Sequence, residues 1–392
     1  MKPEIAVQIF TGGYRNQAVS FDRIEEKLSF VLPKIPVNKV IMGWAPASGE
    51  TYEKTAALLK RQKIEFWLWF PVFSETGALR SLDPLIGFDG KAIVWDGIQK
   101  DEDFSFCCPN NQGNIAKILD VYEKEFSCVK FDGIFLDKIR YPSFANGPDT
   151  EDAIKSGARC VLSCFCPDCL EYYRQKNFDV NLFKNILSDS NYIFNFSRYA
   201  GGGKYQFNHD SFSEFIFLKS GIITQSMEYI CRYFRRKGLK IGMDVFAPFL
   251  SPFVGQDITA LSAMCDFIKP MMYRRTNAPA GLPFETEMLL RGTKAAGIHF
   301  RELPGGYLDK TPFDLSFAAK DLAAMVSPLS CPVYAGVEIN RKPLIAEVYP
   351  AYIAETINAY YKTGIAGFAL SWDLLDAPEE NIIQAADSMG KL

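Results

Sequence analysis

One short stretch decides the predicted fold: residues 131–142 read FDGIFLDKIRYP. Its centre is an apolar run that ends at Asp137, which is the composition of a buried parallel strand. Side chains alternate along a strand, so Gly133, Phe135 and Asp137 share one face. An acidic residue at the end of a buried strand is typical of an α/β barrel, because barrel chemistry occurs at the C-terminal strand ends.

Eight runs along the chain have this buried composition, and helical segments lie between them. The predicted strands are Ile5–Phe10, Lys39–Trp44, Ile64–Phe70, Phe131–Asp137, Lys240–Phe246, Phe267–Tyr273, Val333–Glu338 and Ile365–Ser371. The predicted helices are Ser20–Leu32, Glu50–Lys60, Asn114–Phe126, Ser213–Lys237, Thr286–Ala296, Phe313–Val326, Val348–Thr363 and Asn381–Met389. This repetition predicts an α/β fold, a single (β/α)8 TIM barrel over residues 1–392. A doubly wound open sheet is the alternative, but no Gly-rich phosphate loop follows the first strand.

The repeats are unequal, and the longest connection follows the fourth strand. It spans about 100 residues, whereas a bare crossover needs roughly 30. We expect residues 138–212 to form a cysteine-rich insertion within the barrel. Loops after the strands build the active sites of barrels, so an insertion there shapes a substrate cleft.

Several carboxylates end predicted strands on the inward-facing parity: Asp137, Asp244, Glu338 and Asp373. A glycine stands two residues before Asp244 and before Glu338, and we expect it to leave room for a ligand. Glycoside hydrolysis needs one carboxylic acid to protonate the leaving oxygen and a second carboxylate as nucleophile or base. We predict Asp137 as the leading catalytic group, with Glu338 as its preferred partner and Asp244 next. The alternative for each residue is a helix cap or a loop salt bridge.

Other residues near the same strand ends are predicted to bind substrate. Arg140 follows Asp137 closely and is suited to orient a carboxylate through paired hydrogen bonds. Trp69, Tyr273 and Trp372 are candidates to stack on sugar rings, and Asp373 would line the same site. The alternative for the aromatic residues is packing between strands and helices.

The cysteines cluster in a way that indicates a metal. Cys164, Cys166 and Cys169 give the spacing C-x-C-x2-C, which is too tight for relaxed disulfides but suits one tetrahedral Zn²⁺. Cys108 is the best fourth ligand, with Cys107 and Cys160 as alternatives. A closed site of four thiolates has no open position for water, so this zinc would be structural. The remaining cysteines, Cys128, Cys231, Cys265 and Cys331, are expected to be core residues.

Composition excludes several classes of function. The net charge is −3, which argues against nucleic-acid and anionic-membrane partners. No apolar run reaches the roughly 18 residues of a membrane span. The first residues lack a signal-peptide pattern, so we expect a cytoplasmic protein, or an exported one whose signal is absent from this sequence. The chain contains only two histidines, which argues against a His-based metal centre. No pattern calls for an organic cofactor, and the oligomeric state does not follow from the sequence.

Two groups of known enzymes share parts of this pattern. The segment Cys108-Pro109-Asn110, followed by the group Cys164–Cys169, resembles the zinc cluster of glycoside hydrolase family 42 β-galactosidases. That resemblance implies a (β/α)8 catalytic domain, and Glu338 matches its nucleophile position. The fourth strand departs from it, because Leu136-Asp137 stands where that family has Asn-Glu. This strand is similar to uncharacterised glycosidase-like barrels, to family 114 polygalactosaminidases and, distantly, to α-amylase-type barrels, in which the strand-four Asp is the nucleophile.

The sequence therefore predicts a glycoside hydrolase that cleaves an O-glycosidic bond of a glycan or small glycoside. The alternative is a non-catalytic barrel that binds carbohydrate, in which the carboxylates do not share one pocket. A third class, a metal-dependent hydrolase or an aldolase, is disfavoured by the scarcity of histidine and by the position of Lys269 early in its strand.

Overall fold

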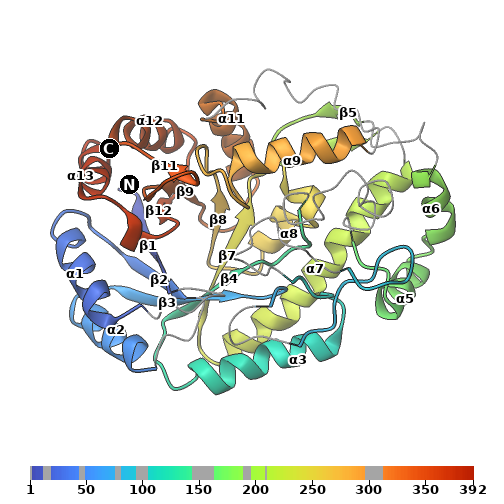
Figure 1. The fold of residues 1–392 in the computed structure, drawn as a ribbon, viewed down its shortest axis with the longest axis horizontal. Coiled ribbons are helices and arrows are strands. Elements are labelled where there is room, and N and C mark those ends of the chain that lie inside the picture. The colour runs from blue at the N-terminus through green and yellow to red at the C-terminus, as the bar shows by residue number, and fades with distance from the viewer. Residues whose placement is uncertain are drawn as a thin grey trace.

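A computed structural model describes residues 2–11, 19–43, 49–75, 81–93, 105–143, 163–188, 196–207, 210–295 and 312–392. Eight parallel strands form one sheet in the order β8-β7-β4-β3-β2-β1-β12-β9. They are β1 Glu4–Phe10, β2 Lys39–Gly43, β3 Glu65–Pro71, β4 Gly133–Asp137, β7 Lys240–Phe246, β8 Phe267–Met271, β9 Tyr334–Glu338 and β12 Gly367–Ser371. Ile268 pairs with Val333 and joins the two end strands. The predicted (β/α)8 TIM barrel is confirmed (Figure 1).

Helices surround the barrel and connect its strands (Figure 1). They are α1 Phe21–Val31, α2 Gly49–Arg61, α3 Gln112–Val121, α7 Asp210–Arg236, α8 Ile258–Ser262, α9 Leu282–Ala295, α11 Leu315–Val326, α12 Pro350–Tyr361 and α13 Glu379–Gly390. A π-helical turn, Tyr122–Phe126, extends α3, and 3₁₀ turns occupy Ser251–Val254 and Leu374–Asp376. Helix α1 begins as predicted, because the Ser20 side chain accepts a hydrogen bond from the Arg23 N–H at 3.4 Å. None of the described helices is both long and apolar enough to cross a membrane.

The predicted strand boundaries are close to those observed, and β7 agrees at both ends. Strand β4 begins at Gly133 rather than Phe131, because Asp132 turns its carboxylate to the preceding strand edge and accepts the Phe66 N–H at 2.8 Å. Strand β8 ends at Met271 rather than Tyr273. Tyr273 instead pairs with Gly281 across the following loop. Trp44, the last residue of the second predicted strand, lies outside the described residues.

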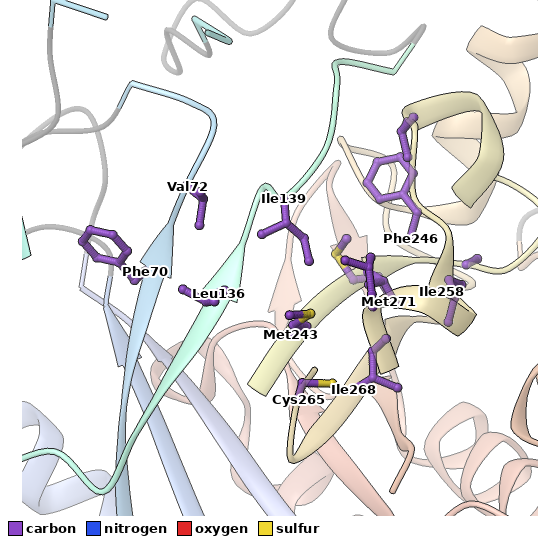
Figure 2. Packing of buried hydrophobic residues seen from close by; sticks show 14 of the residues in the cluster. Phe70, Val72, Leu136, Ile139, Met243, Phe246, Ile258, Cys265, Ile268 and Met271 are labelled. Carbon is purple, nitrogen blue, oxygen red and sulfur yellow. The ribbon is translucent and has the colours of Figure 1, made fainter. Parts of the chain in front are cut away.

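The outer face of the barrel is apolar. Phe70, Leu136, Met243 and Ile268 occupy one register row across β3, β4, β7 and β8, and Figure 2 shows their side chains on these four strands. All four residues are buried. Burying each such side chain contributes about 1.5–3 kcal/mol, so this shell of packing holds the strand ends in place.

An aromatic layer fills the inside of the barrel. Trp67, Phe135, Phe267 and Tyr334 are buried, and the ring centroids of Phe135 and Phe267 are 5.6 Å apart. A Cβ atom at Gly242 would lie 2.6 Å from the Phe267 ring. Our expectation that this glycine leaves room for a ligand is therefore wrong, because the core rings occupy the space.

The insertion after β4 contains helices α5 Pro167–Gln175 and α6 Val180–Ser188 and the hairpin β5 Phe196–Tyr199 with β6 Tyr205–Phe207. Asp321 of α11 anchors this hairpin. Its carboxylate accepts hydrogen bonds from the Tyr199 hydroxyl, from the Gly202 N–H at 2.8 Å and from the Phe249 N–H at 3.0 Å. The hairpin thus fastens the insertion to α11.

Candidate functional site

A cavity of about 150 Å³ lies where the strands of the barrel end. Six of the sequence-predicted site residues line it: Trp69, Asp137, Arg140, Asp244, Tyr273 and Trp372. Glu338 and Asp373 do not. The register explains the grouping, because Leu136 pairs with Met243 and therefore places Asp137 beside Asp244 at the ends of neighbouring strands.

Asp137 has a hydrogen-bond donor on each carboxylate oxygen. The Trp69 Nε1 donates to Oδ2 at 3.0 Å, and the Lys138 N–H donates to Oδ1 at 2.5 Å. Lys138 itself has a positive φ of 51°, which turns the chain immediately after the strand. The Asp137 carboxylate is therefore held in one orientation at the floor of the cavity.

Asp244 has a different environment. Lys269 Nζ lies 2.9 Å from its Oδ2, and both side chains are buried. Its Oδ1 is also buried and has no hydrogen-bond partner among the described residues. Burial raises the pKa of Asp244 to about 7; Lys269 opposes this rise, and the nearby Asp137 adds to it. A carboxyl group with this pKa is part-protonated near neutrality and can deliver a proton.

Arg140 is clamped between aromatic rings. Its guanidinium lies 4.3 Å from the Phe246 ring centroid and 4.8 Å from that of Phe106. Its Nη1 donates to the Tyr141 carbonyl at 3.0 Å. The predicted cation is therefore present in the cavity wall, and stacking fixes its plane.

Glu338, the predicted first partner of Asp137, is placed elsewhere. It is fully buried, and its Oε1 accepts hydrogen bonds from the Arg275 N–H at 2.9 Å, the Thr276 N–H at 2.6 Å and the Thr276 hydroxyl at 2.7 Å. Its Oε2 accepts from the Arg274 N–H at 2.8 Å and from the Tyr352 hydroxyl. Protein donors therefore occupy both oxygens, and the carboxylate fixes the loop after β8.

Asp373 lies behind the cavity rather than in its lining. It caps the 3₁₀ turn by accepting the Leu375 N–H at 3.1 Å, and it also accepts the Phe10 N–H at 3.2 Å. Burial raises its pKa to about 7. This is the helix-cap alternative considered for strand-end acids.

Nine further residues line the cavity that sequence reasoning did not identify, and three of them carry an aromatic ring or a charge: Phe10, Lys138 and Lys342. Phe10 ends β1 and makes an edge contact with Trp69, with ring centroids 6.0 Å apart. The position of Phe10 at a strand end could have identified it from the sequence as a cavity residue. The position of Lys138 next to Asp137 could have done the same. Lys342 comes from the short hairpin of β10 Arg341–Lys342 and β11 Ala346–Glu347, for which the sequence has no comparable marker.

The four predicted cysteine ligands come together outside the cavity. The sulfurs of Cys108, Cys164, Cys166 and Cys169 are buried and lie within 4.8 Å of one another. A tetrahedral zinc with bonds of about 2.3 Å separates its sulfurs by about 3.8 Å, so these residues fit a metal ion. Cys108 comes from the loop after β3 and the other three from the insertion after β4.

The remaining cysteines follow the sequence expectation in part. Cys231 and Cys265 are buried. Cys128 is exposed, which corrects the prediction, because it lies in the turn between the π-helical end of α3 and β4. Cys331 is half-buried, and its sulfur lies 3.6 Å from that of Cys265.

No protein-family model matches the chain, and no curated protein matches its sequence. Among solved structures, the PgaB (BpsB) glycoside hydrolase domain from Bordetella bronchiseptica aligns with a TM-score of 0.58 and 11% identity over 99% of both chains. This chain shares the fold of a glycoside hydrolase domain. A chitinase from Chromobacterium violaceum aligns with a TM-score of 0.44 and 11% identity over 98% of both chains. The α-L-fucosidase isoenzyme 2 from Paenibacillus thiaminolyticus has a TM-score of 0.49 and 12% identity over 99% of this chain and 49% of that one.

These likenesses concern the fold alone. They do not confirm the specific resemblance to family 42 or family 114 enzymes.

Proposed function

We propose that this protein is a glycoside hydrolase that cleaves an O-glycosidic bond with Asp137 and Asp244. The observation that carries the proposal is that two carboxylates from neighbouring strands line one cavity in contrasting environments. Asp244 replaces Glu338, the partner that was predicted first, because Asp244 has a buried oxygen with no described partner. Glycosidases require such a pair of carboxyl groups with separate tasks.

The two environments suggest which task each residue performs. Asp244 acts as the general acid that protonates the leaving oxygen, since its raised pKa keeps a proton available near neutrality. Asp137, oriented by Trp69 and Lys138, acts as the nucleophile or the base. Arg140 and Lys138 line the same cavity and contribute positive charge to its wall.

The rest of the cavity is suited to a sugar. Phe10, Trp69, Tyr273 and Trp372 contribute aromatic surface to its wall. Rings of this kind pack against the apolar faces of sugars, while the polar groups between them bond the hydroxyls. A carbohydrate is therefore the ligand class that the cavity favours, and the fold shared with a glycoside hydrolase domain agrees with it.

The test is a comparison of wild type, Asp137→Asn and Asp244→Asn on a panel of aryl glycosides and glycans, with released sugar as the readout. Asp257→Asn, in the exposed N-cap of α8, is the matched control. We expect hydrolysis by wild type and the control, a large loss in Asp137→Asn on every substrate, and a large loss in Asp244→Asn on glycans. Equal rates in wild type and Asp137→Asn would overturn the proposal. Glycan binding without hydrolysis by folded wild type would support the carbohydrate-binding alternative.

A second comparison assigns the acid. An aryl glycoside with a strongly acidic phenol needs little protonation of its leaving group, whereas an alkyl glycoside needs much. We therefore expect Asp244→Asn to retain most activity on dinitrophenyl glycosides and to lose about a hundredfold on alkyl glycosides. A loss that is equal for both substrates would remove Asp244 from the acid role.

We also infer that the four clustered cysteines hold a structural Zn²⁺. Four buried thiolates from two loops form a closed set with no position for a water molecule, which is the arrangement of structural zinc sites. The Ile86 N–H donates to the Cys164 sulfur at 3.3 Å, as outer donors to zinc thiolates do. Zinc bound there joins the loop after β3 to the insertion.

The metal proposal has its own test, which does not depend on activity. Purified protein is expected to contain about one zinc ion per chain, measured by mass spectrometry of the elements. Cys166→Ser should lose the metal and unfold at a lower temperature. Cys107→Ser is the matched control, since Cys107 is a buried neighbour outside the cluster. Zinc-free wild type with unchanged stability in Cys166→Ser would contradict the proposal.

A further inference from the structure

A row of three ionisable side chains crosses the candidate site. Asp137 ends β4, Asp244 lies beside it on β7, and Asp244 pairs in register with Lys269 on β8. Asp137 and Asp244 line the cavity, but Lys269 does not. Lys269 is fully buried on β8, one strand beyond Asp244. It therefore cannot be explained as a residue that contacts substrate.

Lys269 is held by specific contacts. Its Nζ is 2.9 Å from Asp244 Oδ2 and donates a hydrogen bond to the Tyr273 hydroxyl. It also lies 5.9 Å from the ring centroid of Phe135. A Cβ atom at Gly336 would come within 3.0 Å of Lys269 Cε and of the Tyr273 ring. The glycine before Glu338 thus makes room for Lys269 and Tyr273 rather than for a ligand, which corrects the sequence expectation.

These contacts decide which oxygen of Asp244 is available. Lys269 occupies Oδ2, whereas Oδ1 has no partner among the described residues. A buried ammonium that is paired on one side of a carboxyl group fixes the rotation of that group. We propose that Lys269 is a positioning residue, which leaves Asp244 Oδ1 for the substrate and sets how readily this carboxyl group releases its proton.

The proposal rests on the function proposed above for Asp244, whose carboxyl group is approached from both neighbouring strands. Asp137 and Arg140 approach from the β4 side, and Lys269 and Tyr273 from the β8 side. Burial and Asp137 raise the pKa of Asp244, while Lys269 and Arg140 lower it. Removing the Lys269 charge therefore raises this pKa further and moves the alkaline limit of catalysis to higher pH.

The experiment compares Lys269→Met, which removes the charge, with Lys269→Arg, which keeps it. Lys269→Gln is a second neutral variant in case the methionine variant does not fold. The titration of Asp244 is followed by difference infrared spectroscopy of each protein against its own Asp244→Asn counterpart, and the pH profile of kcat/KM is measured in parallel.

We expect the Asp244 midpoint to rise by about one pH unit or more in the neutral variants, a tenfold change in proton affinity. The arginine variant should stay near wild type, and the alkaline limb of kcat/KM should move with the infrared midpoint. An unchanged or lower midpoint in both neutral variants would overturn the proposal. If the midpoint rises but Asp244→Asn hydrolyses substrate as wild type does, Lys269 controls Asp244 as inferred, and the proposed catalytic role of Asp244 is the part that fails.

Discussion

Strands β7 and β9 look alike in sequence but end differently. Each has a glycine followed two residues later by an inward-facing acid, Asp244 on β7 and Glu338 on β9. Asp244 reaches the cavity with one oxygen free of described partners. Glu338 is enclosed by five donors. The same local pattern therefore produces a cavity-lining carboxyl group on one neighbour of β8 and a structural anchor on the other.

The loop that follows β8 accounts for the difference. Residues Arg274, Arg275 and Thr276 point their backbone N–H groups at Glu338. An ionised carboxylate satisfies these buried donors, which would otherwise be costly. Among the described residues, no loop N–H donates to Asp244, which has Lys269 on one oxygen. The chemistry of a strand-end acid thus depends on the backbone of a neighbouring loop.

The largest effect is expected from Asp137→Asn. Amide substitution keeps the shape but removes the charge that the cavity uses, so we expect kcat/KM to fall about a thousandfold or more, with little change in stability. Steady-state kinetics with a thermal melt measures both. Activity above a tenth of wild type would contradict the proposal, because Asp137 would then not belong to the catalytic pair.

Glu338→Gln should show the opposite behaviour. The amide nitrogen is a donor that would face donors, so we expect unfolding to become easier by about 3 kcal/mol. The kcat of the folded fraction should stay within a few-fold of wild type. Urea denaturation and active-site titration separate the two quantities. A large loss of kcat in a protein of normal stability would return Glu338 to the catalytic pair.

The pH dependence sharpens the assignment of the acid. The pKa of Asp244 is raised to about 7, and the proposed general acid acts in its protonated form. We therefore expect kcat/KM to decline above pH 7 by about tenfold per unit. The pKa of Asp373 is also raised to about 7, so Asp373→Asn is the control and must keep this alkaline limb. Loss of the alkaline limb in Asp373→Asn would show that Asp373, and not Asp244, is responsible for it.

The smallest effect concerns the orientation of Asp137. Trp69→Phe keeps an aromatic ring but removes the donor to Asp137 Oδ2, and we expect kcat/KM to fall about tenfold. Trp67→Phe is the matched control, because the Trp67 Nε1 donates to Glu65 at the opposite end of the same strand. Kinetics on both variants, each corrected for the folded fraction, provides the measurement. Equal losses would attribute the effect to core packing.

Much of the fold follows from sequence because its determinants are local. The apolar run Lys240–Phe246 marks β7 at both ends, and strand parity turns Asp137 and Asp244 inward as expected. Strand parity also predicts that Glu338 points inward. Parity does not predict that the loop at Arg274–Thr276 would donate hydrogen bonds to the Glu338 carboxylate. Lys342 reaches the cavity through a hairpin of two short strands, a placement set by tertiary contacts rather than by composition.

The cysteine cluster limits how segments of this protein can be exchanged for those of another barrel. Three sulfurs belong to the insertion and the fourth, Cys108, to the connection between β3 and β4. The two segments therefore form one structural unit. A chimera that replaced residues 138–212 alone would leave Cys108 without the other three cysteines. The end of β4, with Asp137, would then lie between two connections that no longer bind each other. An exchange of the insertion for that of another barrel would therefore require the connections before and after β4 to be replaced together.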